Sequence, residues 1–219
     1  MKHTLTFDSL HLSFGSKSVL SSIYMQCETG NVVGLLGRNG AGKSCLMKIV
    51  FGAMPCAYKC VRVDDETLTG NYLHRRLIGY LPQQGFIPAS MPLRTVLNLF
   101  QLSEQELAQA FPVYADWMNY RHGELSGGYA RLFECLVILL APYKFCILDE
   151  PFSGLAPLHI ETLKQVIDRQ RSSKGIIITD HLHYQVTSLA DSLYLLLNGQ
   201  AYFIEKREDL VDFGYLSSL

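Results

Sequence analysis

The sequence predicts an α/β fold with a mostly parallel core sheet, an N-terminal antiparallel β subdomain and a small α-helical insertion. From residue 32 onward, short apolar runs typical of buried strands alternate with runs of helical period, an order that favours parallel strands joined by helices. Before that point, apolar and polar side chains alternate between turns, as they do in hairpins. We therefore predict one domain, with the core and β subdomain at residues 1–82 and 130–219 and the helical subdomain at about residues 83–129.

The β subdomain is expected to consist of hairpin-like strands. These strands are expected at residues 5–7, 10–14, 19–27 and 61–63, with turns or loops at residues 15–18, 28–31 and 64–70.

The core is expected to alternate strands with helices. Strands are expected at residues 32–36, 77–81, 145–148 and 176–179, and helices at residues 45–51, 129–140, 157–171 and 184–190. Glycine and proline support these limits, because Gly52 ends the first helix, Pro82 stops a strand and Pro157 opens a helix. A hairpin at residues 193–197 and 201–204 closes the core, and residues 205–219 form a short helix and tail.

The helical insertion begins after Pro82, where the hydrophobic period becomes helical. Thr95 is the candidate N-cap of one helix. Ser103 and Glu106 form a capping-box pattern that predicts the start of the next helix. After the insertion, the helix at residues 129–140 should bury Leu132, Leu136, Leu139 and Leu140.

Composition limits the possible functions. The 219 residues are 48% hydrophobic, which is enough for a sizeable core, and the net charge of −1 gives no basic field for nucleic acid. No secretory signal pattern opens the chain. The apolar stretch at residues 132–148 is interrupted by Glu134, Pro142 and Lys144, so it does not predict a membrane span. We therefore expect any membrane role to depend on a partner.

The six cysteines predict neither a metal site nor disulfides. They contain no CxxC pair, and Cys27, Cys135 and Cys146 lie in apolar runs, where cysteine behaves as a small hydrophobic residue. Cys56 and Cys60 lack a second pair that would complete a metal site. We expect a reduced, cytosolic environment.

The strongest functional motif is a glycine-rich loop between the strand at residues 32–36 and the following helix. It consists of Gly37, Arg38, Asn39, Gly40, Ala41, Gly42, Lys43 and Ser44. Glycines let several backbone N–H groups approach a polyphosphate, and the helix N-terminus adds its dipole. Lys43 would contact the β- and γ-phosphates, and the Ser44 hydroxyl would bind Mg²⁺. A turn that binds nothing fits these flanks poorly.

Two carboxylates end the buried strand at residues 145–148. Asp149 and Glu150 should lie at the carboxyl edge of the parallel sheet, beside the phosphate loop. Asp149 suits Mg²⁺ binding, and Glu150 suits activation of a water molecule next to the γ-phosphate. Considered without that loop, the pair would equally fit a solvated turn.

Two further features are weak by themselves. Ser126, Gly127 and Gly128 open a helix and form a possible anion nest, although an ordinary helix cap is the simpler interpretation. His181 follows the strand at residues 176–179 and could reach a phosphate, although a lone histidine is usually structural.

Taken together, the phosphate loop, Leu-Ser-Gly-Gly, Leu-Asp-Glu-Pro and the late histidine resemble those of an ATP-binding-cassette (ABC) ATPase, a P-loop NTPase, across nearly the whole chain. The resemblance implies ATP and Mg²⁺ as ligands. It implies that Phe14 stacks on adenine and that Gln83, or Gln84 in a second register, contacts Mg²⁺ or the attacking water. By the same resemblance, Ser126, Gly127 and Gly128 close over the γ-phosphate of an opposite subunit, Glu150 is the general base, and His181 braces the base and the γ-phosphate.

Three positions depart from the family pattern. Cys45, which would lie near the α-phosphate, stands where threonine or serine is usual. Tyr129 replaces a glutamine, and Ala156 replaces an aspartate that couples the two sites of a dimer. Because Lys43 and Glu150 are present, hydrolysis is expected to persist.

The resemblance implies a transporter-driving ATPase that forms an ATP-dependent dimer with a second copy and works against a transmembrane permease subunit. Its place would be the cytoplasmic face of the membrane. The alternative is a soluble ABC ATPase acting on nucleic acid or ribosomes, and a third possibility is a regulatory module without turnover. A single cassette without a basic face disfavours the alternative, and Glu150 disfavours the third.

Overall fold

The computed structural model describes residues 2–216. Its core sheet contains β3 (Val32–Leu36), β6 (Ile78–Leu81), β7 (Phe145–Asp149), β8 (Gly175–Thr179), β9 (Ser192–Leu197) and β10 (Gln200–Ile204). Their order across the sheet is β10–β9–β3–β8–β7–β6. All neighbouring pairs are parallel except β10 with β9. The predicted mostly parallel sheet with a closing hairpin is therefore confirmed.

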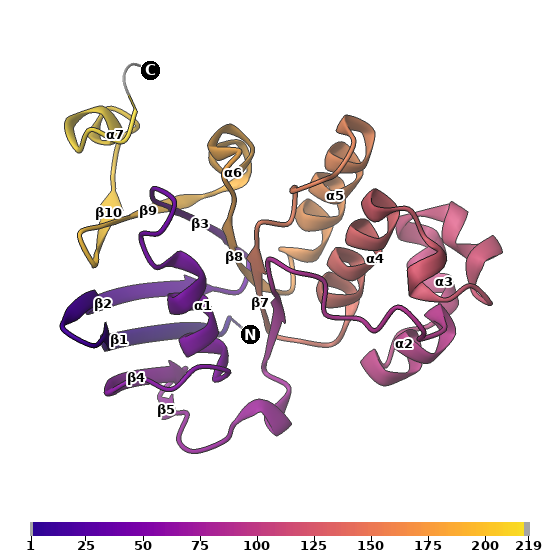
Figure 1. The fold of residues 1–219 in the computed structure, drawn as a ribbon, viewed down its shortest axis with the longest axis horizontal. Helices are drawn as coiled ribbons and strands as arrows, with labels where there is room; N and C mark the ends of the chain where they lie inside the picture. The colour runs from indigo at the N-terminus through magenta and orange to yellow at the C-terminus, as the bar shows by residue number, and fades with distance from the viewer. Residues whose placement is uncertain (1, 217–219) are drawn as a thin grey trace.

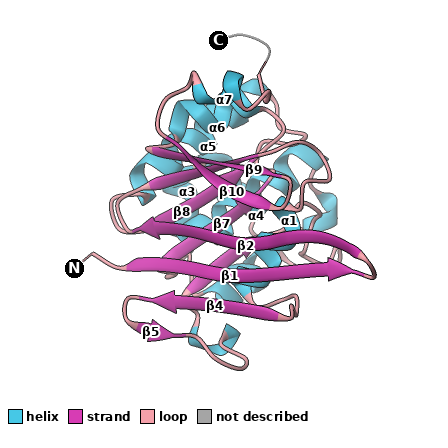
Figure 2. Cartoon of the chain, turned by 90° about the vertical axis from the view of Figure 1, so that its left-hand side faces the viewer, coloured by secondary structure: helices cyan, strands magenta, loops and turns pink. Residues whose placement is uncertain are grey.

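A second sheet is antiparallel and contains β1 (Thr4–Phe14), β2 (Lys17–Glu28), β4 (Tyr58–Val63) and β5 (Glu66–Thr67), in the order β2–β1–β4–β5 (Figure 2). The predicted break between residues 7 and 10 is wrong. One strand continues through it, because the extra residue forms a bulge with Ser9 at φ 56°. The predicted loop at residues 64–70 also contains the short strand β5, which pairs with β4.

Helices cover the core sheet on both faces. α1 (Lys43–Phe51) lies between the two sheets, where its Leu46, Met47, Ile49 and Val50 share one apolar cluster with β1, β2 and β7. The opposite face is covered by α4 (Gly127–Leu140), α5 (Pro157–Gln170) and α6 (His183–Leu189), which share the second cluster. The carboxyl ends of β3 and β7 thus open beside the start of α1 (Figure 1).

The helical part of the chain contains α2 (Leu93–Phe100), α3 (Glu104–Ala110) and the short 3₁₀ turns Pro112–Trp117 and His122–Glu124, and it lies beside α4 (Figure 1). Ser103 and Glu106 form the predicted capping box. The Thr95 cap is wrong, because α2 begins after Pro92 and Thr95 lies inside the helix. The boundaries of the helical subdomain stay a prediction.

The remaining limits agree closely with the sequence pattern. α4 begins two residues earlier than expected, and Leu132, Leu136 and Leu139 are buried while Leu140 is half-buried. A 3₁₀ turn spans Leu73–Arg75, and α7 (Asp209–Asp212) is the short C-terminal helix. Residues 217–219 of the predicted tail lie outside the described residues. Among residues 2–216, none of the helices has the length and apolar character needed to cross a bilayer.

Three cysteines that the sequence places in apolar runs are buried in the structure. Cys27, Cys135 and Cys146 are buried, and none of the six cysteines forms a disulfide. The described part of the chain also contains no cluster of three metal-binding side chains.

Candidate functional site

The loop at residues 37–44 wraps the start of α1. Gly40 and Gly42 have left-handed φ values of 78° and 104°, and a Cβ at Gly42 would lie 2.9 Å from Val19 Cγ1, so this position requires glycine. Lys43 Nζ donates to the carbonyl oxygens of Gly37 at 2.7 Å and Arg38 at 3.2 Å. Burial lowers the pKa of Lys43, and the nearby carboxylates, Glu150 foremost, oppose that shift. The head of the lysine side chain therefore lies inside the curve of the loop, bonded to two of its carbonyl groups.

Asp149 ends β7 beside this loop and is buried. Burial raises the pKa of its carboxyl group, while contacts with the side chains of Ser44 and Tyr80 oppose the rise. The Tyr80 hydroxyl donates to Asp149 Oδ2 at 3.2 Å, but Oδ1 has no hydrogen-bond partner among the described residues. A buried carboxylate oxygen without a partner, near a serine hydroxyl, fits the oxygen ligands that Mg²⁺ takes.

Glu150 and His181 face each other at the ends of neighbouring strands. The distance from Glu150 Oε2 to His181 Nδ1 is 3.7 Å, and Asp180 Oδ1 lies 3.1 Å from the same nitrogen. Asp180 is itself fixed, because its carboxylate accepts the backbone N–H groups of Phe152 and Leu182, both at 2.9 Å. Burial raises the pKa of Asp180. The predicted base and Asp180 thus both lie beside the same ring nitrogen of the predicted histidine.

A cavity of about 700 Å³ joins these parts. Phe14, from the end of β1, lies on its wall with the phosphate loop, and Gln83, Glu150 and His181 lie there as well. Cys45 also lines it, whereas Gln84 does not, so the structure favours the first-choice glutamine. Segments far apart in the chain thus supply the walls of one cavity.

The turn at Ser126–Gly128 is not on the walls of this cavity. It lies at the start of α4, on the other side of β7 from α1 in the view of Figure 1. Ser126 is exposed and its side chain does not cap its own helix. The two glycine-rich turns of one chain are thus separate.

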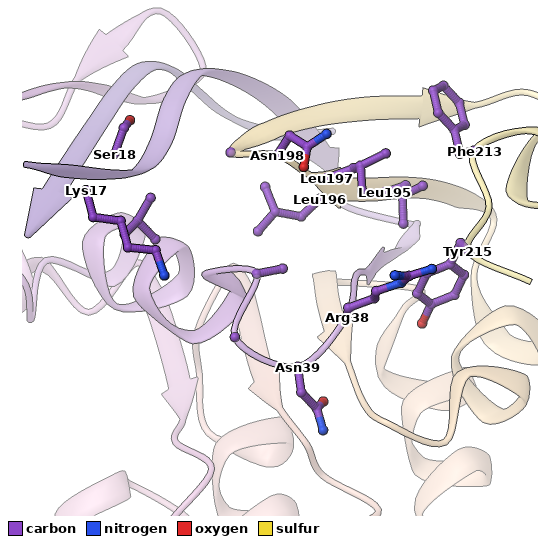
Figure 3. Close-up of a pocket in the computed structure, with 14 residues that line it drawn as sticks. Lys17, Ser18, Arg38, Asn39, Leu195, Leu196, Leu197, Asn198, Phe213 and Tyr215 are labelled. Atoms are coloured by element: carbon purple, nitrogen blue, oxygen red, sulfur yellow. The ribbon is translucent and has the colours of Figure 1, made fainter.

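A second hollow of about 440 Å³ adjoins the phosphate loop on the side of the C-terminal segment (Figure 3). There the Arg38 side chain points toward Tyr215, and Arg38 Nη2 donates to the Gly214 carbonyl at 2.8 Å. Burial raises the pKa of the Tyr215 hydroxyl. Arg38 was expected among the nucleotide-binding residues, and its guanidinium is here engaged with the tail.

Sequence reasoning missed Tyr80, Asp180 and Arg131 as supporting residues. Tyr80 precedes Gln83 by three positions and Asp180 adjoins His181, so both could have been suspected from proximity to a motif. Arg131, whose guanidinium donates to the carbonyl groups of Asp149 and Glu150, lies inside a helical pattern and gave no such signal.

Comparison with known proteins agrees with the fold and the motifs. Residues 20–153, more than half of the chain, match the family model described as ABC transporter. The lipopolysaccharide export system ATP-binding protein LptB of Escherichia coli K12 is 32% identical over 213 residues, covering 90% of this chain and 88% of that protein. The high-affinity branched-chain amino acid transport ATP-binding protein BraG of Pseudomonas aeruginosa is 26% identical, covering 90% of both.

Solved structures give the same result. An ATP-binding subunit of an ABC transporter superposes with a TM-score of 0.84 at 25% identity, covering 96% of this chain and 93% of that one. A bacterial Atm1-family ABC exporter with ATP bound has a TM-score of 0.83 at 18% identity, covering 97% of this chain and 40% of the exporter, and shows the fold alone.

The fold and the phosphate site define an ATP-hydrolysing cassette. The chain belongs to the ABC transporter family, and its function is that of the ATP-binding, ATP-hydrolysing subunit that powers a transporter.

Proposed function

We propose that two copies of this chain bind ATP head to tail and hydrolyse it to drive a transmembrane permease subunit at the cytoplasmic face of the membrane. One observation supports this most strongly. The cavity that holds Lys43, Glu150 and His181 has no wall from Ser126–Gly128, although both turns carry the backbone donors that suit a polyphosphate. A second copy would supply the missing wall.

In the proposed complex the nucleotide lies along the cavity. Phe14 stacks on adenine, and the backbone N–H groups of residues 37–42 surround the phosphates. Lys43 binds the β- and γ-phosphates, the Ser44 hydroxyl lies near the metal site, and Cys45 contacts the region of the α-phosphate. Ser126, Gly127 and Gly128 of the opposite copy close over the γ-phosphate.

Mg²⁺ fits the side chains beside the phosphate loop. Ser44, Gln83 and Asp149 would hold it. The observation that favours a cation there is Asp149 Oδ1, which has no hydrogen-bond partner within residues 2–216. When bound, the ion supplies neutralisation of phosphate charge.

The hydrolytic step uses a water molecule beside Glu150. Glu150 takes a proton from the water while the water oxygen bonds to the γ-phosphorus. The bond between the γ-phosphorus and the oxygen that bridges it to the β-phosphate breaks, which releases ADP and phosphate. His181, placed 3.7 Å from Glu150 Oε2, orients the base and donates to a γ-phosphate oxygen. Loss of the γ-phosphate removes contacts to both copies and lets them separate.

The proposed membrane partner follows from the relatives, whose names describe lipopolysaccharide export and branched-chain amino acid transport. Because such different cargoes are served by similar ATP-binding subunits, we assign the choice of cargo to the permease.

The variant Glu150→Gln tests this proposal. Removal of a general base should lower kcat about 10²–10⁴-fold, while ATP still binds and a dimer becomes visible by size-exclusion chromatography. Glu161→Gln, on the exposed side of α5, is the matched control and should behave like the parent chain. Turnover by Glu150→Gln at the parent rate, or no ATP-dependent dimer, would contradict the proposal.

A further inference from the structure

Two oppositely charged side chains are buried in α4. Arg131 is 8% exposed and Glu134 2% exposed, and Arg131 Nη1 lies 3.4 Å from Glu134 Oε2. Taking both charges out of water is costly, so a buried pair of this kind is weak evidence for stability. The contacts that the two side chains make with other segments explain their presence better.

Arg131 binds three backbone carbonyl oxygens outside its own helix. Nη1 donates to Pro82 O at 2.8 Å, and Nη2 donates to Asp149 O at 2.8 Å and Glu150 O at 2.9 Å. Pro82 directly precedes Gln83, and Asp149 and Glu150 end β7. A planar guanidinium with several fixed donors can bridge such segments, whereas a single ammonium group cannot do so equally well.

The backbone at Glu150 needs this support. Its φ of 52° lies in the left-handed region, which a residue with a side chain seldom adopts. The Glu150 N–H donates to Thr179 O at 2.8 Å, and the Glu150 carbonyl accepts from Arg131. The proposed base is therefore held from both sides, by β8 and by α4.

Glu134 holds the other end of the loop that carries Gln83. Its Oε1 accepts the backbone N–H groups of Phe86 at 3.0 Å and Ile87 at 3.3 Å. A Cβ at Gly85 would lie 3.1 Å from the same oxygen, so the loop approaches the carboxylate closely. His122 Nε2 lies 3.6 Å from Oε1. Residues on both sides of Gln83 are thus attached to α4.

We propose that Arg131 and Glu134 are positioning residues that join the Ser126–Gly128 turn to the hydrolytic site of the same chain. The turn forms the start of α4, and Arg131 follows Gly128 by three residues, so a shift of that helix would move the carbonyl of Glu150 and the Gln83 loop together. When the turn contacts nucleotide bound to the opposite copy, it would then fix the position of Glu150 in the copy that carries the turn. This connection rests on the proposed head-to-tail dimer, and it does not require an aspartate at position 156, where this chain has Ala156.

The variant Arg131→Met removes the donors while keeping a long side chain. Because a displacement of about 1 Å at a reacting group can cost about 10²-fold, we expect kcat to fall about 10²-fold. Since the phosphate loop is untouched, KM for ATP should differ less than about threefold from that of the parent. The melting shift produced by Mg-ATP should likewise stay within about threefold of the parent value. A merely structural role would lower the melting temperature without this split between kcat and KM.

Two further variants complete the test. Arg131→Lys keeps the charge opposite Glu134 but not the fork of donors, so its kcat should lie between those of the parent and Arg131→Met. Arg169→Met removes an exposed arginine whose guanidinium makes its one hydrogen bond within residues 2–216 to Gln165 O in α5, and it should match the parent.

A kcat for Arg131→Met within about twofold of the parent would overturn this inference, as would equal losses in kcat and nucleotide binding. If Arg131→Met does not fold, the same comparison of kcat with nucleotide binding is made on Arg131→Lys. Failure of both variants to fold would show a structural role and would overturn the inference. A parent chain that neither binds nor hydrolyses ATP would instead overturn the proposed function.

Discussion

The phosphate loop and the Ser126–Gly128 turn use the same chemistry in opposite surroundings. Each is a glycine-containing turn that begins a helix, α1 in one case and α4 in the other. A Cβ at Gly42 would collide with Val19, whereas a Cβ at Gly127 would meet no other atom within 4 Å. Lys43 is folded into its loop, while Ser126 is exposed.

The difference distinguishes a binding region that one chain builds by itself from a region that needs a second copy. Around the phosphate loop, the chain supplies a cation, carboxylates and an aromatic wall, so we expect a nucleotide to bind to a single copy. Around the other turn, Ser126 and Gly127 are exposed, and residues 126–128 do not line the nucleotide cavity. Turnover should therefore depend on both regions, but simple binding on only the first.

Substitutions in the two regions should separate binding from turnover, and this is the largest expected effect. Lys43→Ala should lower kcat about 10²–10³-fold and also remove the melting shift with Mg-ATP, because a charged contact to the phosphates is lost. Ser126→Glu should lower kcat similarly, by charge repulsion with the γ-phosphate, but keep the melting shift. ATPase assays and thermal melts of the two variants measure both quantities, and identical behaviour of the two would remove the distinction.

Nucleotide binding to the first region should stabilise the parent chain. At one hundred times its dissociation constant, Mg-ATP should add ~2.7 kcal/mol to the free energy of unfolding. For a chain of this size, that corresponds to a melting shift of roughly 5–11 °C. Ser126→Glu is the matched control and should shift by a similar amount. No shift at millimolar Mg-ATP would contradict an intact phosphate site.

The ionised, buried carboxylate of Asp149 should lower the free energy of unfolding in the absence of ligand. Burial raises the pKa of Asp149 in the folded chain above the ordinary 3.8. Its contribution to the free energy of unfolding is therefore fully present below pH 3.8 and is lost as pH rises through the folded pKa. Asp149→Asn, which does not titrate, should therefore melt higher than the parent at pH 7 in the absence of nucleotide, with the difference shrinking toward pH 3. Asp168→Asn, on the exposed side of α5, should show no such trend. A lower melting temperature for Asp149→Asn at pH 7 would contradict this account.

Cys45 should give the smallest effect. Its thiol is a weaker hydrogen-bond donor than a hydroxyl. Restoring one neutral hydrogen bond near the phosphates, worth about 0.5–1.4 kcal/mol, should lower KM for ATP about 2–10-fold in Cys45→Thr. Cys60→Thr in β4 controls for the substitution itself. An increase in KM for Cys45→Thr would show that the thiol is better suited to this site.

The first region was largely predictable from sequence because its parts lie in local patterns. The residues at 37–44 follow an apolar strand and precede a helix, and Asp149 and Glu150 directly end another strand. Parallel strands bring such ends together, which is why residues 39–44 and Glu150 line one cavity. The Thr95 cap failed because Pro92 starts that helix earlier.

The supporting contacts could not be predicted in the same way. Arg131 reaches Pro82 and Glu150 across 49 and 19 residues of sequence, and periodicity alone would place it on a polar helix face. Tyr80 and Asp149 are likewise joined only in the folded chain. Buried contacts between distant segments depend on side-chain packing and leave no local signal.

Mixing the two inactive variants tests the central claim most directly. A dimer of one Lys43→Ala chain and one Ser126→Glu chain contains one site in which both turns are intact. In an equal mixture, half of the dimers should be of this kind, so ATPase activity should return to about a quarter of the parent value. Activity that stays at the level of the separate variants would contradict a site shared between the phosphate loop of one copy and the Ser126–Gly128 turn of the other.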